Sequence, residues 1–247
     1  MDSHWNYNFP DGLSIQAFAS PSAARDDNET LAQNIEDYGI AGRIWEAAYD
    51  LQQYFRPPDY LEMDPPCSFC SVTSGERKTV IELGSGTGVG GLSAARVLQP
   101  EDLLVLTDLA AVLPLLEINL RRDMARRAEA EKSAGEVWIR ALPWGDTHVA
   151  EAVRLELREC GRNVTQILCS DLVYFPALLA PLLRSLIEIT SWSAGVEVII
   201  SCRLRDPIKE TPFWSAFGVW FEFTPVLAKD LRKGPGSRWT EAGLAIA

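Results

Sequence analysis

The sequence has very little histidine, and this bears on metal binding. Its only two histidines, His4 and His148, lie far apart in the chain. Cys67 and Cys70 have the spacing of half a zinc site, but no second cysteine pair and no neighbouring histidine complete it. We therefore expect no metal site.

Positive charge is also scarce. The chain has 23 lysine and arginine residues against 34 aspartate and glutamate residues, which gives a net charge of −11. Because nucleic-acid binding by counter-ion release needs a concentrated basic surface, this balance opposes a nucleic-acid partner. Residues 1–40 carry seven of the acids and one arginine. That acidic flank is typical either of a surface for a basic protein partner or of a solvated surface.

Long apolar runs are missing as well. No run approaches the roughly 20 residues of a membrane helix. The first residues, MDSHWNYNFPDG, lack the basic region and apolar core of a signal peptide. Five cysteines, an odd number without a secretory signal, indicate reduced thiols inside a cell. We expect no membrane partner and a cytoplasmic location, with the nucleus as the alternative.

Glycine, in contrast, is concentrated between Thr79 and Leu92, which read TVIELGSGTGVGGL. The β-branched start favours a buried strand, and five glycines between positions 84 and 91 end that strand abruptly. A chain that turns from a strand into a helix beside a ligand needs positive φ angles and a close backbone approach, both of which glycine allows. The stretch predicts a cofactor-binding loop of the nucleotide type.

Two glycine patterns in this loop point to different cofactors. The spacing Gly86-x-Gly88-x-x-Gly91 satisfies the dinucleotide fingerprint, but this match is weak in so glycine-rich a loop. The spacing Glu82-x-Gly84-x-Gly86-x-Gly88 places a carboxylate two residues before the first glycine. An acid there repels a pyrophosphate and attracts a cationic ligand end, such as an ammonium or sulfonium group. The second pattern therefore favours a cationic cofactor.

Strands and helices alternate from this loop onward over roughly 150 residues, which predicts a mostly parallel α/β sheet with helices on both faces. We expect residues 39–247 to form this domain, beginning with a helix over 39–55. Residues 56–78 contain four prolines and predict an irregular connection. Residues 1–38 form an N-terminal extension with a possible short hairpin around its Pro-Asp-Gly turn. The seven expected strands are 79–83, 103–107, 136–142, 166–169, 195–202, 220–227 and 239–247.

Polar or aromatic residues lie at or just beyond the ends of four of these strands, at the edge where such sheets bind ligands: Glu82, Asp108, Trp144 and Asp171. A carboxylate at Asp108 can accept hydrogen bonds from both hydroxyls of a ribose. Trp144 offers an aromatic surface to a base. Asp171 and Tyr174 are three residues apart and both can face one channel.

Each of these residues also has a purely structural interpretation. Asp108 and Asp171 could cap the helices that follow them. Trp144 and Tyr174 could simply pack, and Trp45, on the first helix, is by sequence alone better explained as a core residue.

Five segments occur in an order that resembles one known family. They are Trp45-Glu46-Ala47-Ala48, IELGSGTGVGGL from Ile81, Thr107-Asp108-Leu109 with Asn119, Trp144-Gly145, and Asp171-Leu172-Val173-Tyr174. Together they resemble the seven-strand, S-adenosylmethionine-dependent lysine methyltransferases that modify chaperones, AAA-type ATPases and translation elongation factors. The resemblance spans roughly residues 40–200. Neither the first 40 or so residues nor the 56–78 connection shows a family pattern.

This resemblance implies a Rossmann-like seven-stranded fold, S-adenosylmethionine as cofactor, and methylation of a lysine ε-amine on a protein by a chain that we expect to be monomeric. Asp171 and Tyr174 are then expected to border the channel for the target amine. The residues expected to contact the cofactor are Trp45, Glu82, Gly84, Ser85, Gly86, Gly88, Asp108, Trp144 and Ser170.

Other functions share parts of this pattern. A methyltransferase acting on a small amine or on another side chain has the same cofactor motifs. Nucleic-acid amino-methyltransferases commonly carry prolines after strand four, where this chain has Asp171-Leu172-Val173-Tyr174. Assignment as an oxidoreductase would not explain the acid at Glu82. The alternative that is not an enzyme is a non-catalytic module that binds the cofactor.

Overall fold

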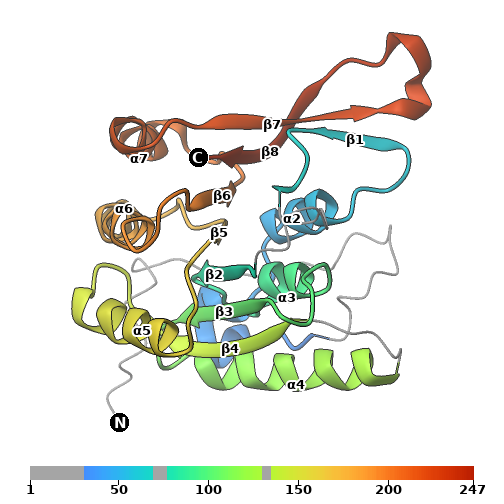
Figure 1. The fold of residues 1–247 in the computed structure, drawn as a ribbon. Coiled ribbons are helices and arrows are strands. Elements are labelled where there is room, and N and C mark those ends of the chain that lie inside the picture. The colour runs from blue at the N-terminus through green and yellow to red at the C-terminus, as the bar shows by residue number, and fades with distance from the viewer. Residues whose placement is uncertain (1–30, 69–76, 130–134) are drawn as a thin grey trace.

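The computed structural model of the protein describes residues 31–68, 77–129 and 135–247 (Figure 1). The possible hairpin near the N-terminus lies outside these ranges. Strands in the described ranges are β1 (Leu61–Asp64), β2 (Thr79–Leu83), β3 (Leu103–Asp108), β4 (Glu136–Ala141), β5 (Gln166–Ser170), β6 (Glu197–Ser201), β7 (Thr224–Asp230) and β8 (Thr240–Ile246). Helices are α1 (Ile35–Tyr38), α2 (Ala47–Phe55), α3 (Val89–Ala95), α4 (Leu113–Glu129), α5 (Thr147–Glu159), α6 (Pro176–Thr190) and α7 (Pro207–Trp220), with 3-10 turns η3 (Gly39–Gly42) and η6 (Leu231–Gly236).

The strands form one sheet in the order β1-β7-β8-β6-β5-β2-β3-β4. The five strands from β6 to β4 in this order run parallel, whereas β8, β7 and β1 pair antiparallel. The β2–β5 pair lies at the centre, and the order of the parallel strands along the chain reverses there. In open α/β sheets, such a reversal is where ligands bind, beyond the carboxyl ends of the strands.

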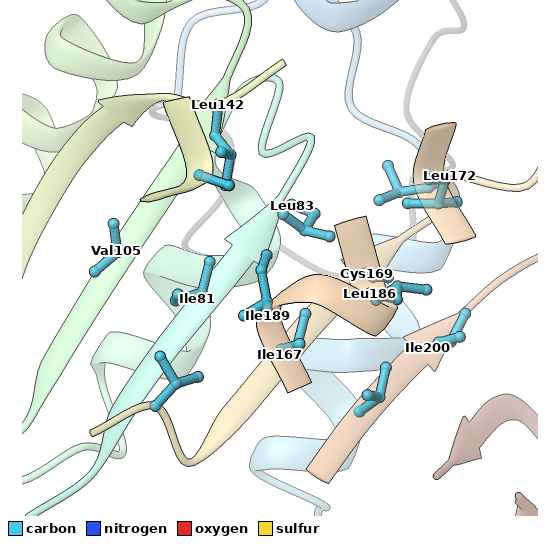
Figure 2. Close-up of a cluster of buried hydrophobic side chains, with 14 of the residues drawn as sticks. Ile81, Leu83, Val105, Leu142, Ile167, Cys169, Leu172, Leu186, Ile189 and Ile200 are labelled. Carbon is cyan, nitrogen blue, oxygen red and sulfur yellow. The ribbon is translucent and has the colours of Figure 1, made fainter. Parts of the chain in front are cut away.

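Side chains of the central strands alternate between the two faces of the sheet, and each face has its own core. On β2, Val80 packs with residues of α2, α3 and α4, whereas Ile81 and Leu83 pack with residues of α5, α6 and α7. Figure 1 shows these two helix groups on opposite sides of the sheet, and Figure 2 shows part of the second core. Because both faces are covered, the central strands are apolar almost throughout, as is typical of parallel sheets.

The predicted α/β sheet is confirmed, with one strand more than expected. The extra strand, β1, arises within the 56–78 connection and pairs antiparallel with β7, so that Leu61 faces Asp230. It lies at the edge of the sheet between Pro58 and Pro65, where prolines are tolerated because one side of the strand needs no partner. Strand β7 starts at Thr224 rather than at residue 220, because α7 continues to Trp220.

The helix predicted over residues 39–55 is divided into η3 and α2. A Cβ atom at Gly42 would lie only 2.0 Å from the carbonyl oxygen of Asn34. The backbone N–H of Asn34 donates to the carbonyl oxygen of Gly42 at 2.9 Å. This close backbone packing takes the chain off the helical path, and Trp45 lies in the segment between the two helical pieces.

The described part of the N-terminal extension packs against the main domain. Leu31 is buried in the first core. The backbone N–H of Ala32 donates to Oδ1 of Asn119 on α4 at 2.7 Å, and Nδ2 of Asn119 donates to the carbonyl oxygen of Thr87 in the glycine loop at 2.9 Å. Asn119 therefore ties the extension to the glycine loop.

Two general features complete the fold. Cys67 is disulfide-bonded, so the expectation that all thiols are reduced is wrong at this residue, whereas Cys160, Cys169 and Cys202 are free. None of the helices in the described residues is both long and apolar enough to cross a membrane.

Candidate functional site

The loop between β2 and α3 adopts a conformation that requires its glycines. Gly84, Gly86 and Gly88 have φ angles of 57°, 54° and 81°, a region that side chains disfavour. Space is limited as well. A Cβ at Gly84 would lie 2.8 Å from the ring of Trp144, and one at Gly86 would lie 2.9 Å from the carbonyl oxygen of Ala41.

The last two glycines of the loop make room for Glu82. A Cβ at Gly90 would lie 2.5 Å from Oε1 of Glu82, and one at Gly91 would lie 2.6 Å from Oε2. Glu82 is 1% exposed, and its carboxyl group is hydrogen-bonded by the side chain of Ser85 and the backbone of Gly91. Burial outweighs these bonds and raises the pKa of this carboxyl to about 8. The pKa is raised because the charged form is poorly solvated there, so a cationic ligand at this end of the site would favour the ionised form.

Asp108 lies on the other side of the loop, at the end of β3. Its Oδ2 accepts the N–H of Gly86 at 2.8 Å, and its Oδ1 accepts the N–H of Leu109 at 2.7 Å. Burial raises the pKa of Asp108 to about 6. Helix α4 starts only at Leu113, so Asp108 is bonded to the glycine loop and does not cap that helix.

Aromatic rings gather at the ends of β4 and β5. The rings of Trp144 and Tyr174 are 6.5 Å apart in an edge-to-face arrangement, and Tyr174 contacts Phe175 in the same way at 4.8 Å. Burial raises the pKa of the Tyr174 phenol above its usual range. These rings form an apolar wall, on which the hydroxyl of Tyr174 remains protonated at physiological pH.

Asp171, directly after β5, is ion-paired in this structure. It is the one described residue other than glycine with a positive φ, at 61°. The guanidinium of Arg205 donates Nη1 to Oδ1 and Nη2 to Oδ2, both at 2.6 Å. Helix α6 begins after Phe175 without a side-chain cap, so Asp171 does not cap it.

Trp45 is half-buried rather than part of the core. Its indole N–H donates to the carbonyl oxygen of Ile40 at 3.0 Å. The guanidinium groups of Arg43 and Arg205 lie 4.3 and 5.3 Å from its ring centre, within the range of cation–π contacts. The sequence-based preference for core burial is therefore wrong for Trp45.

These residues surround one cavity of about 780 Å³, a volume in the range of cofactor pockets. Gly88 is not part of its lining; it stands at the start of α3 instead. The ten other residues predicted from the sequence line the cavity: Trp45, Glu82, Gly84, Ser85, Gly86, Asp108, Trp144, Ser170, Asp171 and Tyr174.

Sequence reasoning missed several lining residues, of which Arg205 is the most prominent. It follows β6 at the same edge of the sheet as Asp108 and Asp171. The same consideration of strand ends, extended to β6, would have found it. Ile40, Ala41 and Arg43 were missed because they were assigned to a helix.

The cavity suits a cofactor with a cationic end and a ribose. A carboxyl group such as that of Glu82 can accept an ammonium group, and Asp108, which can accept ribose hydroxyls, lines the same cavity. A Rossmann-like sheet extended by antiparallel strands, with this acid before its glycine loop, defines the class of S-adenosylmethionine-dependent methyltransferases.

Comparison with known proteins narrows this class. A family described as lysine methyltransferase matches residues 25–217, which include most of the described chain. The chain therefore belongs to this lysine methyltransferase family. The match begins within the segment interpreted from sequence as an extension and includes the 56–78 connection.

Individual relatives agree with this assignment. EEF1A lysine methyltransferase 3 of Mus musculus is 32% identical over 58% of this chain and 50% of its own length. Protein-lysine N-methyltransferase EFM6 of Saccharomyces cerevisiae is 28% identical over 62% of this chain and 59% of its own length. Protein N-lysine methyltransferase METTL21A of Danio rerio is 28% identical over 71% and 66%. The chain thus matches from half to about two thirds of the length of these relatives.

A solved structure of a putative O-methyltransferase from Klebsiella pneumoniae is also similar. The match covers 68% of this chain and 71% of the chain in that structure, with 16% sequence identity and a TM-score of 0.42.

Proposed function

We propose that this protein transfers a methyl group from S-adenosylmethionine to the ε-amine of a lysine on another protein. One observation supports this most strongly. Residues of the glycine loop, Glu82 and the aromatic residues Trp144 and Tyr174 all line a single cavity. This supports a cofactor site and an acceptor channel that share one space.

Family membership implies S-adenosylmethionine as the methyl donor. When bound, it supplies an electrophilic methyl group on a sulfonium. Glu82 would hold the cationic amino-acid end of the cofactor, and Asp108 would accept hydrogen bonds from its ribose. Trp45, Trp144 and Ser170, which line the same cavity, would contact it as well.

The protein must also deliver the lysine amine in its neutral form. A free lysine has a pKa near 10.4, so removing its proton at pH 7 costs about 4–5 kcal/mol. An apolar surrounding lowers this cost because it disfavours the charged form. Trp144, Tyr174 and Phe175 provide such a surrounding, and the ring of Tyr174 forms part of the channel wall.

Asp171 has a positioning role rather than that of a general base. Both of its oxygens are engaged by Arg205. A carboxylate beside an ammonium group would raise the pKa of the amine and so oppose its deprotonation.

The finer features of the function are proposals from resemblance. The substrate is a protein of the chaperone, ATPase or translation-factor classes, and the name of the mouse relative makes EEF1A the first one to test. We further propose that the protein acts as a monomer, which light scattering can check.

We propose a cytoplasmic location, with the nucleus as the alternative. The free thiols of Cys160, Cys169 and Cys202 support it, whereas the disulfide at Cys67 opposes it. Fractionation of cells that express the tagged chain distinguishes these compartments from the secretory pathway.

A labelling experiment tests the activity. The purified protein is incubated with S-adenosylmethionine labelled in its methyl group and either purified EEF1A or a cell lysate, and labelled proteins are identified by mass spectrometry. We expect label on a lysine. Tight cofactor binding without label on any protein would favour a non-catalytic binding module, and label on small molecules alone would favour a small-amine methyltransferase.

A further inference from the structure

Arg205 connects three elements at the edge of the cavity. It comes from the segment between β6 and α7, and its guanidinium holds both oxygens of Asp171 after β5. The same guanidinium donates to Oε2 of Glu46 at 3.2 Å and lies 5.3 Å from the ring centre of Trp45. Arg205 itself lines the cavity.

The exposure of this ion pair is unequal. The side chain of Asp171 is 2% exposed, whereas that of Arg205 is 40% exposed. Arg205 therefore covers the carboxylate on the solvent side. A buried carboxylate that lost this partner would retain an uncompensated negative charge next to the channel.

The segment that carries Arg205 is itself fixed. The buried carboxylate of Glu210 accepts the backbone N–H groups of Arg205 and Asp206, each at 2.9 Å. The N–H of Asp171, whose backbone is in the left-handed region, donates to the carbonyl oxygen of Ser201 at 2.8 Å. Both partners are thus held by buried contacts, as expected for a strained residue at a functional position.

We propose that Arg205 is a positioning residue of the acceptor channel, which holds Asp171 and cancels its charge so that the target lysine reaches the cavity as a neutral amine. This rests on the proposed function. Arg205 acts through Asp171 and takes no part in bond making.

The pKa values of three ionisable groups near Asp171 lie outside the range from pH 7 to 9.5. Burial raises the pKa of Asp50 to about 6 and that of Cys202 to about 11, and that of Tyr174 lies above its usual range. Glu82, with a pKa of about 8, lines the same cavity, but the positive charge of saturating S-adenosylmethionine keeps it ionised. The substrate amine is therefore the main group expected to titrate in the assay. The charged and ionisable groups around Asp171 are Glu46, Asp50, Tyr174, Cys202, Arg203 and Arg205.

The test is the pH dependence of kcat from pH 7 to 9.5, with saturating S-adenosylmethionine and the acceptor protein labelled in the experiment above. We expect Arg205→Gln to lower kcat at pH 7.5 by about tenfold and to shift the rising limb by about one pH unit upward, because the free Asp171 charge stabilises the ammonium form. Arg205→Lys retains the charge and should recover part of the activity. Adding Asp171→Asn to Arg205→Gln should move the rising limb back down.

Lys209→Gln is the matched control. Lys209 pairs with Asp206, the residue next to Arg205, at 2.6 Å, but it does not line the cavity. We expect its pH profile to match that of the unmodified protein. Calorimetry with S-adenosylmethionine should show similar cofactor affinity in all of these variants. Thermal unfolding should show a lower Tm in Arg205→Gln, because its Asp171 carboxylate stays buried without its ion-pair partner.

Three outcomes would contradict the proposal. An unshifted pH profile of kcat in Arg205→Gln would show that Arg205 does not cancel the charge of Asp171. Higher activity of Arg205→Gln at every pH would mean that Arg205 blocks the channel and is displaced by substrate. If Arg205→Gln does not fold, Arg205→Met takes its place, and an unshifted profile in that folded variant would reduce Arg205 to a structural role. An inactive unmodified protein that binds the cofactor would instead overturn the proposed function, and this inference with it.

Discussion

At the scale of single residues, the buried carboxyl of Glu82 lowers the stability of the folded protein at neutral pH and is proposed to bind the cofactor. This carboxyl has a pKa raised to about 8, so the folded protein keeps a proton that the unfolded chain releases above a pH of about 4.5. The contribution of Glu82 to stability is therefore fully present at low pH and is lost as pH rises towards 8. Asp50 and Asp108, whose pKa values are about 6, should affect mainly the range below pH 6.5.

We predict that Glu82→Gln removes this dependence and weakens the cofactor site. Between pH 6.5 and 8, the Tm of the cofactor-free protein should fall less in Glu82→Gln than in the unmodified protein. Affinity for S-adenosylmethionine should fall by about 1.5–3 kcal/mol, the scale of a hydrogen bond to a charged group.

Calorimetry at pH 7 in buffers of different ionisation enthalpy checks the same assignment. Roughly one proton should be released per cofactor bound by the unmodified protein, because a cationic ligand favours ionised Glu82. No release should occur with Glu82→Gln. Equal proton release by both proteins would assign the proton to another group.

The role of a residue was predictable from the sequence where a carboxylate or a tryptophan stands at the end of a predicted strand. Glu82, Asp108, Trp144 and Asp171 all follow this pattern and line the cavity. The pairing of Asp171 with Arg205 was not predictable, because the two residues are 34 positions apart and meet only through the β5–β6 pairing. The role of Gly90 and Gly91 in accommodating Glu82 likewise depends on packing.

At the scale of elements, the glycine loop and the segment before α2 form two sides of the cavity. They approach closely at Gly86, where a Cβ atom would lie 2.9 Å from the carbonyl oxygen of Ala41. We predict that Gly86→Ala strongly weakens S-adenosylmethionine binding, because the side chain would push these two elements apart.

Gly195→Ala is the control for backbone strain alone. Gly195 has a φ of 71°, and a Cβ atom at this position would have no other atom within 4 Å. Both variants should lose stability by about 1 kcal/mol or more from the disfavoured backbone. Only Gly86→Ala should lose affinity for S-adenosylmethionine. Equal affinities of the two variants, measured by calorimetry, would show that Gly86 is not part of the cofactor site.

Trp45 tests the segment before α2. We predict that Trp45→Phe lowers cofactor affinity at nearly constant Tm, because the residue is half-buried and loses its hydrogen bond to Ile40. Cofactor binding should also change the tryptophan fluorescence less in this variant than in the unmodified protein. A large fall in Tm with normal affinity would restore the core interpretation.

The elements that sequence reasoning missed are those defined by tertiary contacts. Strand β1 alternates apolar and charged residues over only four positions, too short a run among prolines to predict a strand, and it forms where β7 offers it a free edge. The break before α2 depends on the contact of Gly42 with Asn34. Buried strands such as β2 and β3 were predictable, because two covered faces require a continuous apolar sequence.

At the scale of the whole molecule, the order of strands and helices predicted an α/β sheet with its ligand edge at the strand ends. The antiparallel strands β7 and β8 were found but not their places in the sheet. Strand β8, at the end of the sequence, lies between β6 and β7, and no local pattern shows such an insertion. The acidic charge opposed nucleic acid as a partner, but identification of a protein substrate rests on the resemblance to the relatives.

Methyl transfer to lysine, compared between the unmodified protein and Asp171→Ala, is the most direct measurement. Both proteins are incubated with labelled S-adenosylmethionine and the acceptor, and the methylated residue is mapped by mass spectrometry. We expect a methylated lysine with the unmodified protein and at least ~100-fold slower transfer with Asp171→Ala, the scale of a lost positioned group, while cofactor affinity changes little. Tight binding of S-adenosylmethionine with no methylated lysine in any acceptor, or undiminished transfer by Asp171→Ala, would contradict the proposed function or the role of Asp171, respectively.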